Sequence, residues 1–196
     1  MHWNGETIVD IERSFLDTNG VRVVVDAKVV DAQAALPGQA VTSKATLEQD
    51  LKSLLSDLNH TSQKGLQTIF DSSVGRSTVN HPIGGRYQIT PTEASVQKLP
   101  VEHGKTETVS VMAQGYNPYV AAWSPYHGAA YAVIEATARL VAAGSDWSKA
   151  RFSYQEYFER MDKQAERFGQ PVSALLGSIE AQIQLGLPSI GGKDSM

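Results

Sequence analysis

Hydrophobic side chains recur at helical spacing in several parts of this chain, first between positions 47 and 58. Five leucines there lie mostly three or four residues apart: Leu47, Leu51, Leu54, Leu55 and Leu58. This spacing gathers them on one face and predicts an amphipathic helix over 47–58. Thr46 and Gln49 stand at the positions of a capping box, which would begin that helix. A second, shorter helix is predicted over 62–70.

An alternating pattern precedes this helix and predicts a half-buried strand over 21–29. Small apolar side chains occupy every second position there: Val21, Val23, Val25, Ala27 and Val29. A period of two is the spacing of side chains along one face of a strand. Asn19-Gly20 favours a turn before the strand, because both residues tolerate positive φ angles. Pro37-Gly38 interrupts the chain after it.

Periodicity disappears between Asp71 and Pro100, where glycine, proline and serine are frequent. A structureless stretch of this length is unusual inside one compact domain. We therefore interpret it as a linker between two globular units. A long functional loop is the alternative.

Regular spacing returns after this segment. An alternating pattern predicts a strand over 106–113. The strongest helical pattern follows over 125–143, where Ser124 supplies an N-cap and Pro125 a first-turn proline. Gly144 is placed to end this helix.

The remaining segments alternate between the two kinds of structure. We expect a turn over 115–118, a short strand over 150–154, and helices over 155–168 and 173–185. Residues 187–190 form a short extended run before a pair of glycines. Mixed strands and helices predict an α/β or α+β fold.

Composition narrows the class of protein. The 196 residues are 41% hydrophobic and 19% charged, so the chain can bury a core. The net charge of −4 argues against nucleic-acid binding, which needs clustered basic side chains. No apolar run is long enough to span a membrane, and there is no cysteine for a disulfide, a thiolate metal site or a nucleophile. We expect a cytoplasmic protein that binds neither nucleic acid nor membranes.

The sharpest chemical signal is a cluster of small and polar residues: Gly191, Gly192, Lys193, Asp194 and Ser195. Glycines allow close backbone approach to an anion, while the other three offer a cation, a carboxylate and a hydroxyl. The P-loop pattern is not met, because Gly186 lies one residue too far away and Asp194 replaces Ser or Thr. A surface turn is the alternative. A glycine pair before such a cluster is unusual in a frayed terminus, so we expect the chain to be a piece of a longer protein.

Three residues of the 125–143 helix are further candidates. Glu135 and Arg139 are four residues apart, which favours a solvated ion pair; a helix carboxylate binding Mg²⁺ at nucleotide phosphates is the functional alternative. His127 lies at the helix start, where it would tend to be neutral and could hydrogen-bond a ligand. A structural or exposed histidine is the alternative there.

Nine short motifs occur in an order that resembles one enzyme family. They are Phe70-Asp71-Ser72-Ser73-Val74-Gly75, Ile83-Gly84-Gly85-Arg86, Thr90-Pro91-Thr92-Glu93-Ala94-Ser95, Leu99-Pro100-Val101, Trp123-Ser124-Pro125-Tyr126-His127-Gly128-Ala129, Ala132-Val133-Ile134-Glu135-Ala136, Phe152-Ser153-Tyr154-Gln155-Glu156-Tyr157-Phe158, Ala174-Leu175-Leu176-Gly177 and Ile190-Gly191-Gly192-Lys193-Asp194-Ser195-Met196. The series resembles the large, single-chain phosphoribosylformylglycinamidine synthases of the clostridial type. The resemblance covers most of residues 62–196 and is looser over 1–61.

The resemblance implies that the chain is an internal piece of a much longer polypeptide. Such enzymes join two halves, each similar to aminoimidazole ribonucleotide synthetase, to a C-terminal glutaminase. Residues 1–75 would end the first half and 76–100 would connect the two. Residues 101–196 would then be an incomplete ATP-binding domain that begins the second half, inactive in isolation.

The resemblance also implies a reaction and its ligands. The family uses ATP, Mg²⁺ and glutamine to convert formylglycinamide ribonucleotide into formylglycinamidine ribonucleotide in purine biosynthesis. Residues 191–195, with His127 and Arg139, would contact nucleotide or substrate, and Glu135 would bind Mg²⁺. One departure is Arg139, where family members often have a second, asparagine ligand. The glutaminase cysteine would lie elsewhere in the polypeptide.

Two other functions are compatible with these patterns. The chain could belong to another ATP-dependent member of the same superfamily, although the ordered motifs of the connecting segment argue against it. It could also be a non-catalytic structural or interaction protein that keeps the fold, an interpretation that Arg139 favours.

Overall fold

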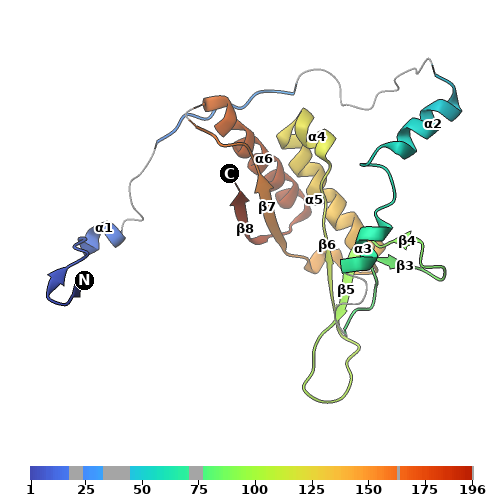
Figure 1. Ribbon diagram of the computed structural model, residues 1–196, viewed down its shortest axis with the longest axis horizontal. Helices are drawn as coiled ribbons and strands as arrows, with labels where there is room; N and C mark the ends of the chain where they lie inside the picture. The colour runs from blue at the N-terminus through green and yellow to red at the C-terminus, as the bar shows by residue number, and fades with distance from the viewer. Residues whose placement is uncertain (18–23, 33–44, 71–76, 163, 196) are drawn as a thin grey trace.

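The computed structural model describes residues 1–17, 24–32, 45–70, 77–162 and 164–195 (Figure 1). These residues have an α+β architecture, with helices and, within the described ranges, four two-stranded sheets. The turn expected at Asn19-Gly20, the break at Pro37-Gly38 and residues 71–76 lie outside the described residues. The division into domains at 75 and 100 stays a prediction.

The chain begins with a small hairpin that the sequence analysis missed. Strands β1 (His2–Trp3) and β2 (Glu6–Thr7) pair antiparallel. Asn4 and Gly5 between them have φ angles of 48° and 85°, as a type I′ turn requires. The Asn-Gly signal that could have revealed it was present at positions 4 and 5. Helix α1 (Arg13–Asp17) follows.

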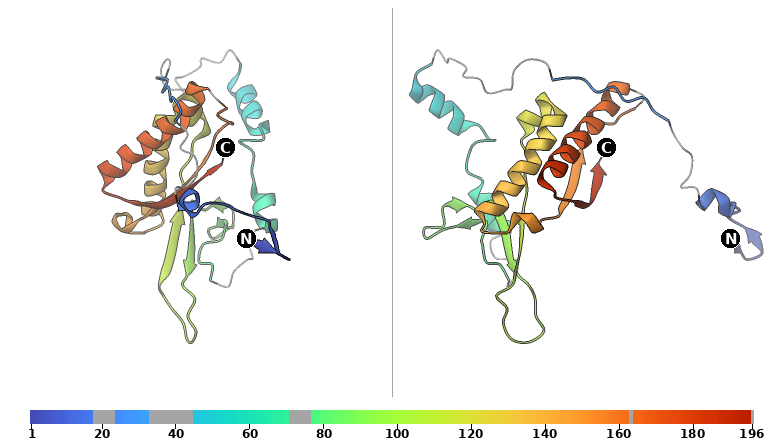
Figure 2. Two further views of the ribbon diagram at one scale, coloured as in Figure 1. Left: turned by 90° about the vertical axis from the view of Figure 1, so that its left-hand side faces the viewer. Right: turned by 180° about the vertical axis from the view of Figure 1, so that it is seen from behind.

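Two further helices precede the larger part of the fold. Helix α2 (Leu47–Ser56) confirms the predicted amphipathic helix, and Thr46 and Gln49 form the expected capping box. Helix α3 (Lys64–Phe70) confirms the second helix. Figures 1 and 2 show α1 and α2 standing apart from the later elements, and the α2 leucines are accordingly exposed.

The strand predicted over 21–29 is wrong for its described part, because residues 24–29 have no strand partner there. This segment instead lies along the start of a later helix. The backbone N–H of Lys28 donates to the carbonyl of Ala165 at 2.8 Å, and Lys28 Nζ lies 3.3 Å from a carboxylate oxygen of Glu166. The alternation of apolar and polar residues alone could not show that residues 24–29 have no strand beside them to pair with in the described part of the chain.

Residues 77–100 are more ordered than predicted. Strand β3 (Ile83–Gly84) pairs antiparallel with β4 (Thr90–Pro91). Strand β5 (Ala94–Lys98) pairs antiparallel with β6 (Val109–Ala113), which confirms the end of the predicted 106–113 strand. Frequent glycine and proline hid these short strands, although β3 and β5 each pair with the next strand along the chain.

Two consecutive helices follow β6. Asn117 caps α4 (Pro118–Trp123), which replaces the turn expected at 115–118. Ser124 then caps α5 (Pro125–Ala142), as predicted, and its hydroxyl accepts from the backbone N–H of His127. Gly144 has a φ of 81° just beyond the helix, which is the left-handed conformation that favours glycine at a helix end.

The last elements form a β–α–β unit after a short 3₁₀ turn, η1 (Trp147–Lys149). Strand β7 (Phe152–Tyr157) and strand β8 (Ser189–Ser195) are parallel and are joined by helix α6 (Ala165–Leu185). The helix predicted over 155–168 is wrong over 155–157, because pairing with β8 keeps these residues extended, and of its described residues only 165–168 belong to a helix, α6. The predicted 173–185 helix is the larger part of α6.

The core lies between α5, α6 and β7. Its buried members are Val133, Ala136, Phe152, Ala181 and Leu187. Two glycines bring the helices close together. A Cβ on Gly177 of α6 would collide with the carbonyl of Tyr126 on α5, and one on Gly128 would lie 2.5 Å from Ala121 Cα on α4. We call β5, β6, α4, α5, β7, α6 and β8 together the C-terminal lobe.

Among the described residues, no helix combines the length and apolar character needed to cross a lipid bilayer.

Candidate functional site

The predicted phosphate-binding cluster lies on a strand and not in a loop. Residues 191–195 continue β8, paired parallel with β7 from Ser153 to Tyr157. An extended strand does not form the concave anion nest that was expected, because a nest needs alternating helical conformations. Pairing with β7 is what keeps these residues extended. Gly192 lies opposite Tyr154, so close that a Cβ at Gly192 would lie 2.9 Å from the Tyr154 carbonyl oxygen.

Lys193 and Ser195 point to the same face of β8, as residues two apart in a strand do. The Lys193 ammonium donates to the Ser195 hydroxyl at 3.2 Å. The side chain of Asp194 lies outside what the structure describes, and its backbone pairs with Glu156. The strand thus presents one cation and one hydroxyl together.

The carboxyl ends of β7 and β8 point toward the same end of the lobe, near the beginnings of α5 and α6 (Figure 1). Ligands of parallel α/β sheets bind outside the carboxyl ends of their strands. Lys193 and Ser195 pair with Gln155 and Tyr157 on the exposed face of this sheet, whereas Phe152 and Tyr154 face the helices. The position at the strand ends, and not the helix N-termini, is therefore what makes an anionic ligand near Lys193 and Ser195 compatible with the fold.

His127 lies at the start of α5 and is already engaged. Its Nδ1 lies 2.8 Å from the Ser124 hydroxyl. Its ring packs 4.9 Å from the ring of Trp123 and 5.3 Å from that of Tyr126. Tyr126 also hydrogen-bonds to Glu180 of α6. These contacts give His127 a structural role at the helix cap, while its ligand-binding role stays a prediction.

Glu135 and Arg139 form the predicted ion pair, at 2.8 Å, and it belongs to a larger cluster. The same guanidinium reaches Glu93 through Nε at 2.7 Å and the Gln114 carbonyl through Nη1 at 2.9 Å. The second Glu135 oxygen accepts from the backbone N–H of Tyr116 at 2.8 Å. The local patterns of Glu93, Gln114 and Tyr116 gave no sign of these contacts, because nothing in them points to Glu135 or Arg139 so far along the chain.

These contacts do not fit Glu135 as a magnesium ligand. Both of its oxygens are engaged by N–H donors, and the neighbouring cation is Arg139, which cannot bind a metal. In the described part of the chain, no three His, Asp or Glu side chains gather in a way that could hold a metal ion. We therefore assign no step to a metal held by these residues.

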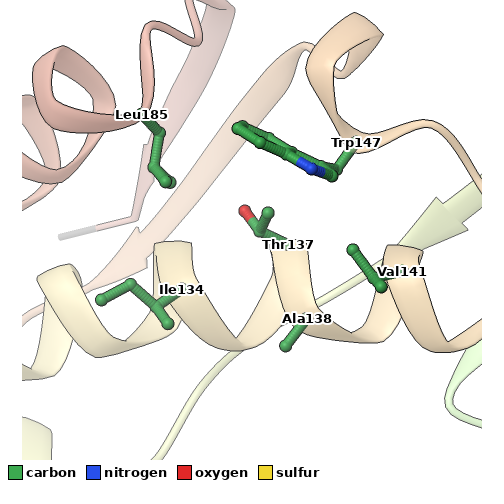
Figure 3. Close-up of a pocket in the computed structure, with 6 residues that line it drawn as sticks. All are labelled: Ile134, Thr137, Ala138, Val141, Trp147 and Leu185. Carbon is green, nitrogen blue, oxygen red and sulfur yellow. The ribbon is translucent and has the colours of Figure 1, made fainter.

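A hollow beside α5 is too small and too apolar for a nucleotide. Figure 3 shows Trp147 and Leu185 pointing toward the helix face of Ile134, Thr137 and Val141. Its volume is about 200 Å³, whereas ligand pockets usually occupy ~300–1,000 Å³. The hydroxyl of Thr137 is bonded to the Val133 carbonyl at 2.8 Å. The hollow is better explained as incomplete packing between α5, η1 and α6.

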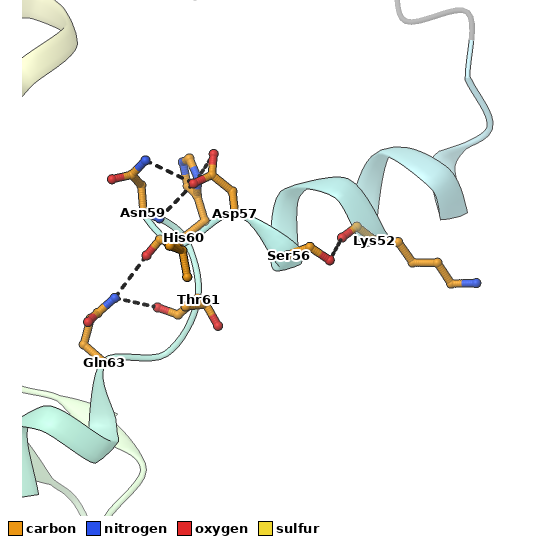
Figure 4. A network of polar contacts seen from close by, with 8 residues as sticks. Lys52, Ser56, Asp57, Asn59, His60, Thr61 and Gln63 are labelled. Atoms are coloured by element: carbon orange, nitrogen blue, oxygen red, sulfur yellow. Dashed lines mark hydrogen bonds and ion pairs between the residues drawn. The ribbon is translucent and has the colours of Figure 1, made fainter.

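A polar network between α2 and α3 is a second group of titratable side chains (Figure 4). Asp57 accepts from the backbone N–H and the side-chain amide of Asn59, at 2.8 and 3.0 Å. His60 lies 3.5 Å from the same carboxylate. The Asn59 backbone N–H, above all, lowers the pKa of Asp57 below its usual value. These short-range bonds shape the turn after α2 and do not form a ligand site.

Tyr154 of β7 is the most perturbed titratable group among the described residues. Burial raises the pKa of its hydroxyl to about 12. That hydroxyl oxygen is buried, and no described residue hydrogen-bonds to it. Its ring stacks 5.8 Å from the ring of Phe152. It lies beside the candidate strand, opposite Gly192, and sequence reasoning missed it because only burial makes it unusual.

Comparisons with protein-family models, with curated proteins and with solved structures found no match to this chain.

Proposed function

We propose that this chain is part of an ATP- and glutamine-dependent formylglycinamidine ribonucleotide synthase, spanning the junction of its two synthetase-like halves. The ordered motifs of residues 70–196 support the proposal. The structural observation that carries it is the β7–α6–β8 unit, which places Lys193 and Ser195 on one face near the carboxyl end of a parallel strand. Anionic ligands of α/β sheets bind at that end.

The proposed reaction needs positive charge where phosphate is transferred. ATP phosphorylates the amide oxygen of formylglycinamide ribonucleotide, which releases ADP and leaves an iminophosphate. Ammonia from glutamine then adds to the carbon, and phosphate departs. Lys193 would stabilise the transferring phosphoryl group, because a positioned cation there lowers the barrier. Ser195 would orient the Lys193 ammonium. ATP with Mg²⁺ would be the nucleotide species, and we assign no ligand for its metal among the described residues.

The test compares Lys193→Ala with an otherwise unchanged complete polypeptide that carries this sequence. Synthesis of formylglycinamidine ribonucleotide, with ammonium chloride as the nitrogen source, is expected to fall about 100-fold. Glutamine hydrolysis should largely survive, since the glutaminase lies elsewhere. Lys105→Ala is the matched control, because Lys105 is an exposed lysine in the connection between β5 and β6. Unchanged synthesis in Lys193→Ala would remove Lys193 from the site.

A structural or interaction protein that keeps the fold is the second candidate. The exposed apolar face of α2 favours it, because large exposed apolar patches commonly mark protein contacts. Absence of ATP-dependent synthesis from the complete polypeptide, with either ammonia or glutamine, would favour this alternative. Turnover of ATP with a different acceptor would favour another ATP-dependent enzyme of the same superfamily.

A further inference from the structure

The Arg139 side chain is bound on three sides by oxygen. Its Nε lies 2.7 Å from a carboxylate oxygen of Glu93, and its Nη2 lies 2.8 Å from one of Glu135. Its Nη1 donates to the Gln114 carbonyl at 2.9 Å. The three oxygen groups come from three separate segments: the residue before β5, the residue after β6 and the middle of α5. One guanidinium therefore connects all three.

The charges explain why a cation is needed at this point. Without Arg139, two carboxylates and a carbonyl oxygen would face one another with no compensating charge. The side chains of Arg139 and Glu135 are only 29% and 34% exposed, so solvent screens them incompletely. Carboxylates together with a backbone carbonyl are also the ligand type that hard divalent cations prefer.

We propose that the guanidinium of Arg139 takes the place of a divalent cation between Glu93 and Glu135, and that Glu135 positions a loop and binds no metal in this chain. One side chain that is always protonated both cross-links the three segments and offsets one of the two negative charges. Neither these contacts nor the test depends on the synthetase activity proposed above.

The loop after β6 shows what the cluster positions. Glu135 accepts from the Tyr116 backbone N–H, and Arg139 donates to the Gln114 carbonyl, so α5 holds the loop from both sides of Gly115. A Cβ on Gly115 would collide with the Ala132 carbonyl of α5. This close approach fixes the path of the chain from β6 into α4. Glu135 and Arg139 are positioning residues in this sense.

The proposal is tested with Mn²⁺, a paramagnetic substitute for Mg²⁺ whose free concentration is read by electron paramagnetic resonance. The 196-residue chain, Glu135→Gln and Arg139→Ala are titrated at low ionic strength. We expect the wild type and Glu135→Gln to bind Mn²⁺ equally weakly. Arg139→Ala should gain one site at least tenfold tighter than any in the wild type, and adding Glu135→Gln to it should remove that site. Arg151→Ala is the control, because it loses the same charge while Arg151, among the described residues, hydrogen-bonds only to the carbonyls of Lys149 and Ala150.

Thermal unfolding provides a second measurement on the same proteins. Arg139→Ala should unfold at a lower temperature than the wild type in EDTA, and Mn²⁺ should restore part of the loss only in this variant. Mn²⁺ binding by the wild type that Glu135→Gln abolishes would overturn the proposal, and this comparison needs no Arg139 variant to fold. A folded Arg139→Ala protein that neither binds Mn²⁺ nor responds to it would also overturn it.

Discussion

Helices α2 and α5 have similar sequence signals and different environments. Both begin after a capping residue whose hydroxyl accepts a hydrogen bond from a backbone N–H of the first turn, and both carry apolar side chains at helical spacing. In α5, Val133 is 1% exposed, whereas Leu54 of α2 is 49% exposed. Periodicity therefore specifies a helix and its apolar face but does not supply the surface that covers that face.

The C-terminal lobe and the earlier helices also differ in how closely their backbones pack. The lobe contains glycines whose missing side chains let α4, α5 and α6 touch, as at Gly128 and Gly177. Gly65 of α3 has open space around its Cβ position. The same residue type thus serves packing in one region and has no packing role in the other. Substitutions at matched positions in the two regions test this contrast.

The largest effect is expected from Gly177→Ala. The new methyl group would collide with the Tyr126 carbonyl, so α5 and α6 must separate. We expect a loss of about 3 kcal/mol in the free energy of unfolding, despite the gain in helix propensity. Urea unfolding followed by circular dichroism measures it.

The matched control for this variant is Gly65→Ala, at the second residue of α3. It should be neutral or slightly stabilising, since alanine is the better helix former and meets nothing there. Equal effects of the two alanines would show that helix contact does not depend on Gly177.

A medium effect is expected from Val133→Ala, which removes two methyl groups from the most buried side chain of the lobe. Each buried methylene contributes roughly 0.8 kcal/mol, and the cavity adds to the loss, so about 2 kcal/mol is expected. Leu54→Ala should change the free energy of unfolding by less than about 0.5 kcal/mol, because the side chain is half exposed. A loss at Leu54 as large as that at Val133 would mean that a surface covers α2 in solution.

The smallest effect is expected from Tyr154→Phe, which removes a buried hydroxyl that no described residue satisfies. Because a buried polar group without a partner is destabilising, its removal should raise the free energy of unfolding by about 1 kcal/mol at neutral pH. Tyr157→Phe is the control on the same strand, since Tyr157 is exposed, and it should change little. A loss of stability in Tyr154→Phe would indicate a hydrogen-bond partner for this hydroxyl.

The pH dependence of the same variant gives an independent check. Burial raises the folded-state pKa of Tyr154 to about 12, from an ordinary value of 10.0. Between these values the unfolded tyrosine loses its proton and the folded one keeps it. The wild type should therefore lose stability as the pH rises from 10 to 12. Tyr154→Phe should lack this contribution to the decline.

Local signals predicted those elements whose stabilisation is mainly local. Ser124 and Pro125 correctly placed the start of α5, and Thr46 correctly placed that of α2. Two of the errors were local, at the Asn4-Gly5 hairpin and at α4 with its Asn117 cap, and others fell where distant partners decide. Residues 155–157 fall within the predicted 155–168 helix but pair with β8, and α6 continues through Pro171, where a proline normally interrupts a helix.

In the candidate site, too, local features were predicted and contacts between distant residues were not. The sequence identified the polar cluster at 191–195 and the pairing of Glu135 with Arg139. It could not place Glu93 and Gln114 around the same guanidinium, because they are 46 and 25 positions away from Arg139 in the sequence. Nor could it show that the cluster at 191–195 is extended, since a pair of glycines is compatible with a turn or a strand.

The caps at Thr46 and Ser124, the apolar faces of α2 and α5 and the charged side chains available for chemistry can all be read from the sequence, because each depends on neighbours within about one helical turn. Tertiary contacts are needed to know which apolar face is buried, which glycines are contact points and which cation pairs with Glu135. Those outcomes depend on backbones and charges brought together from distant parts of the chain, where local spacing carries no information.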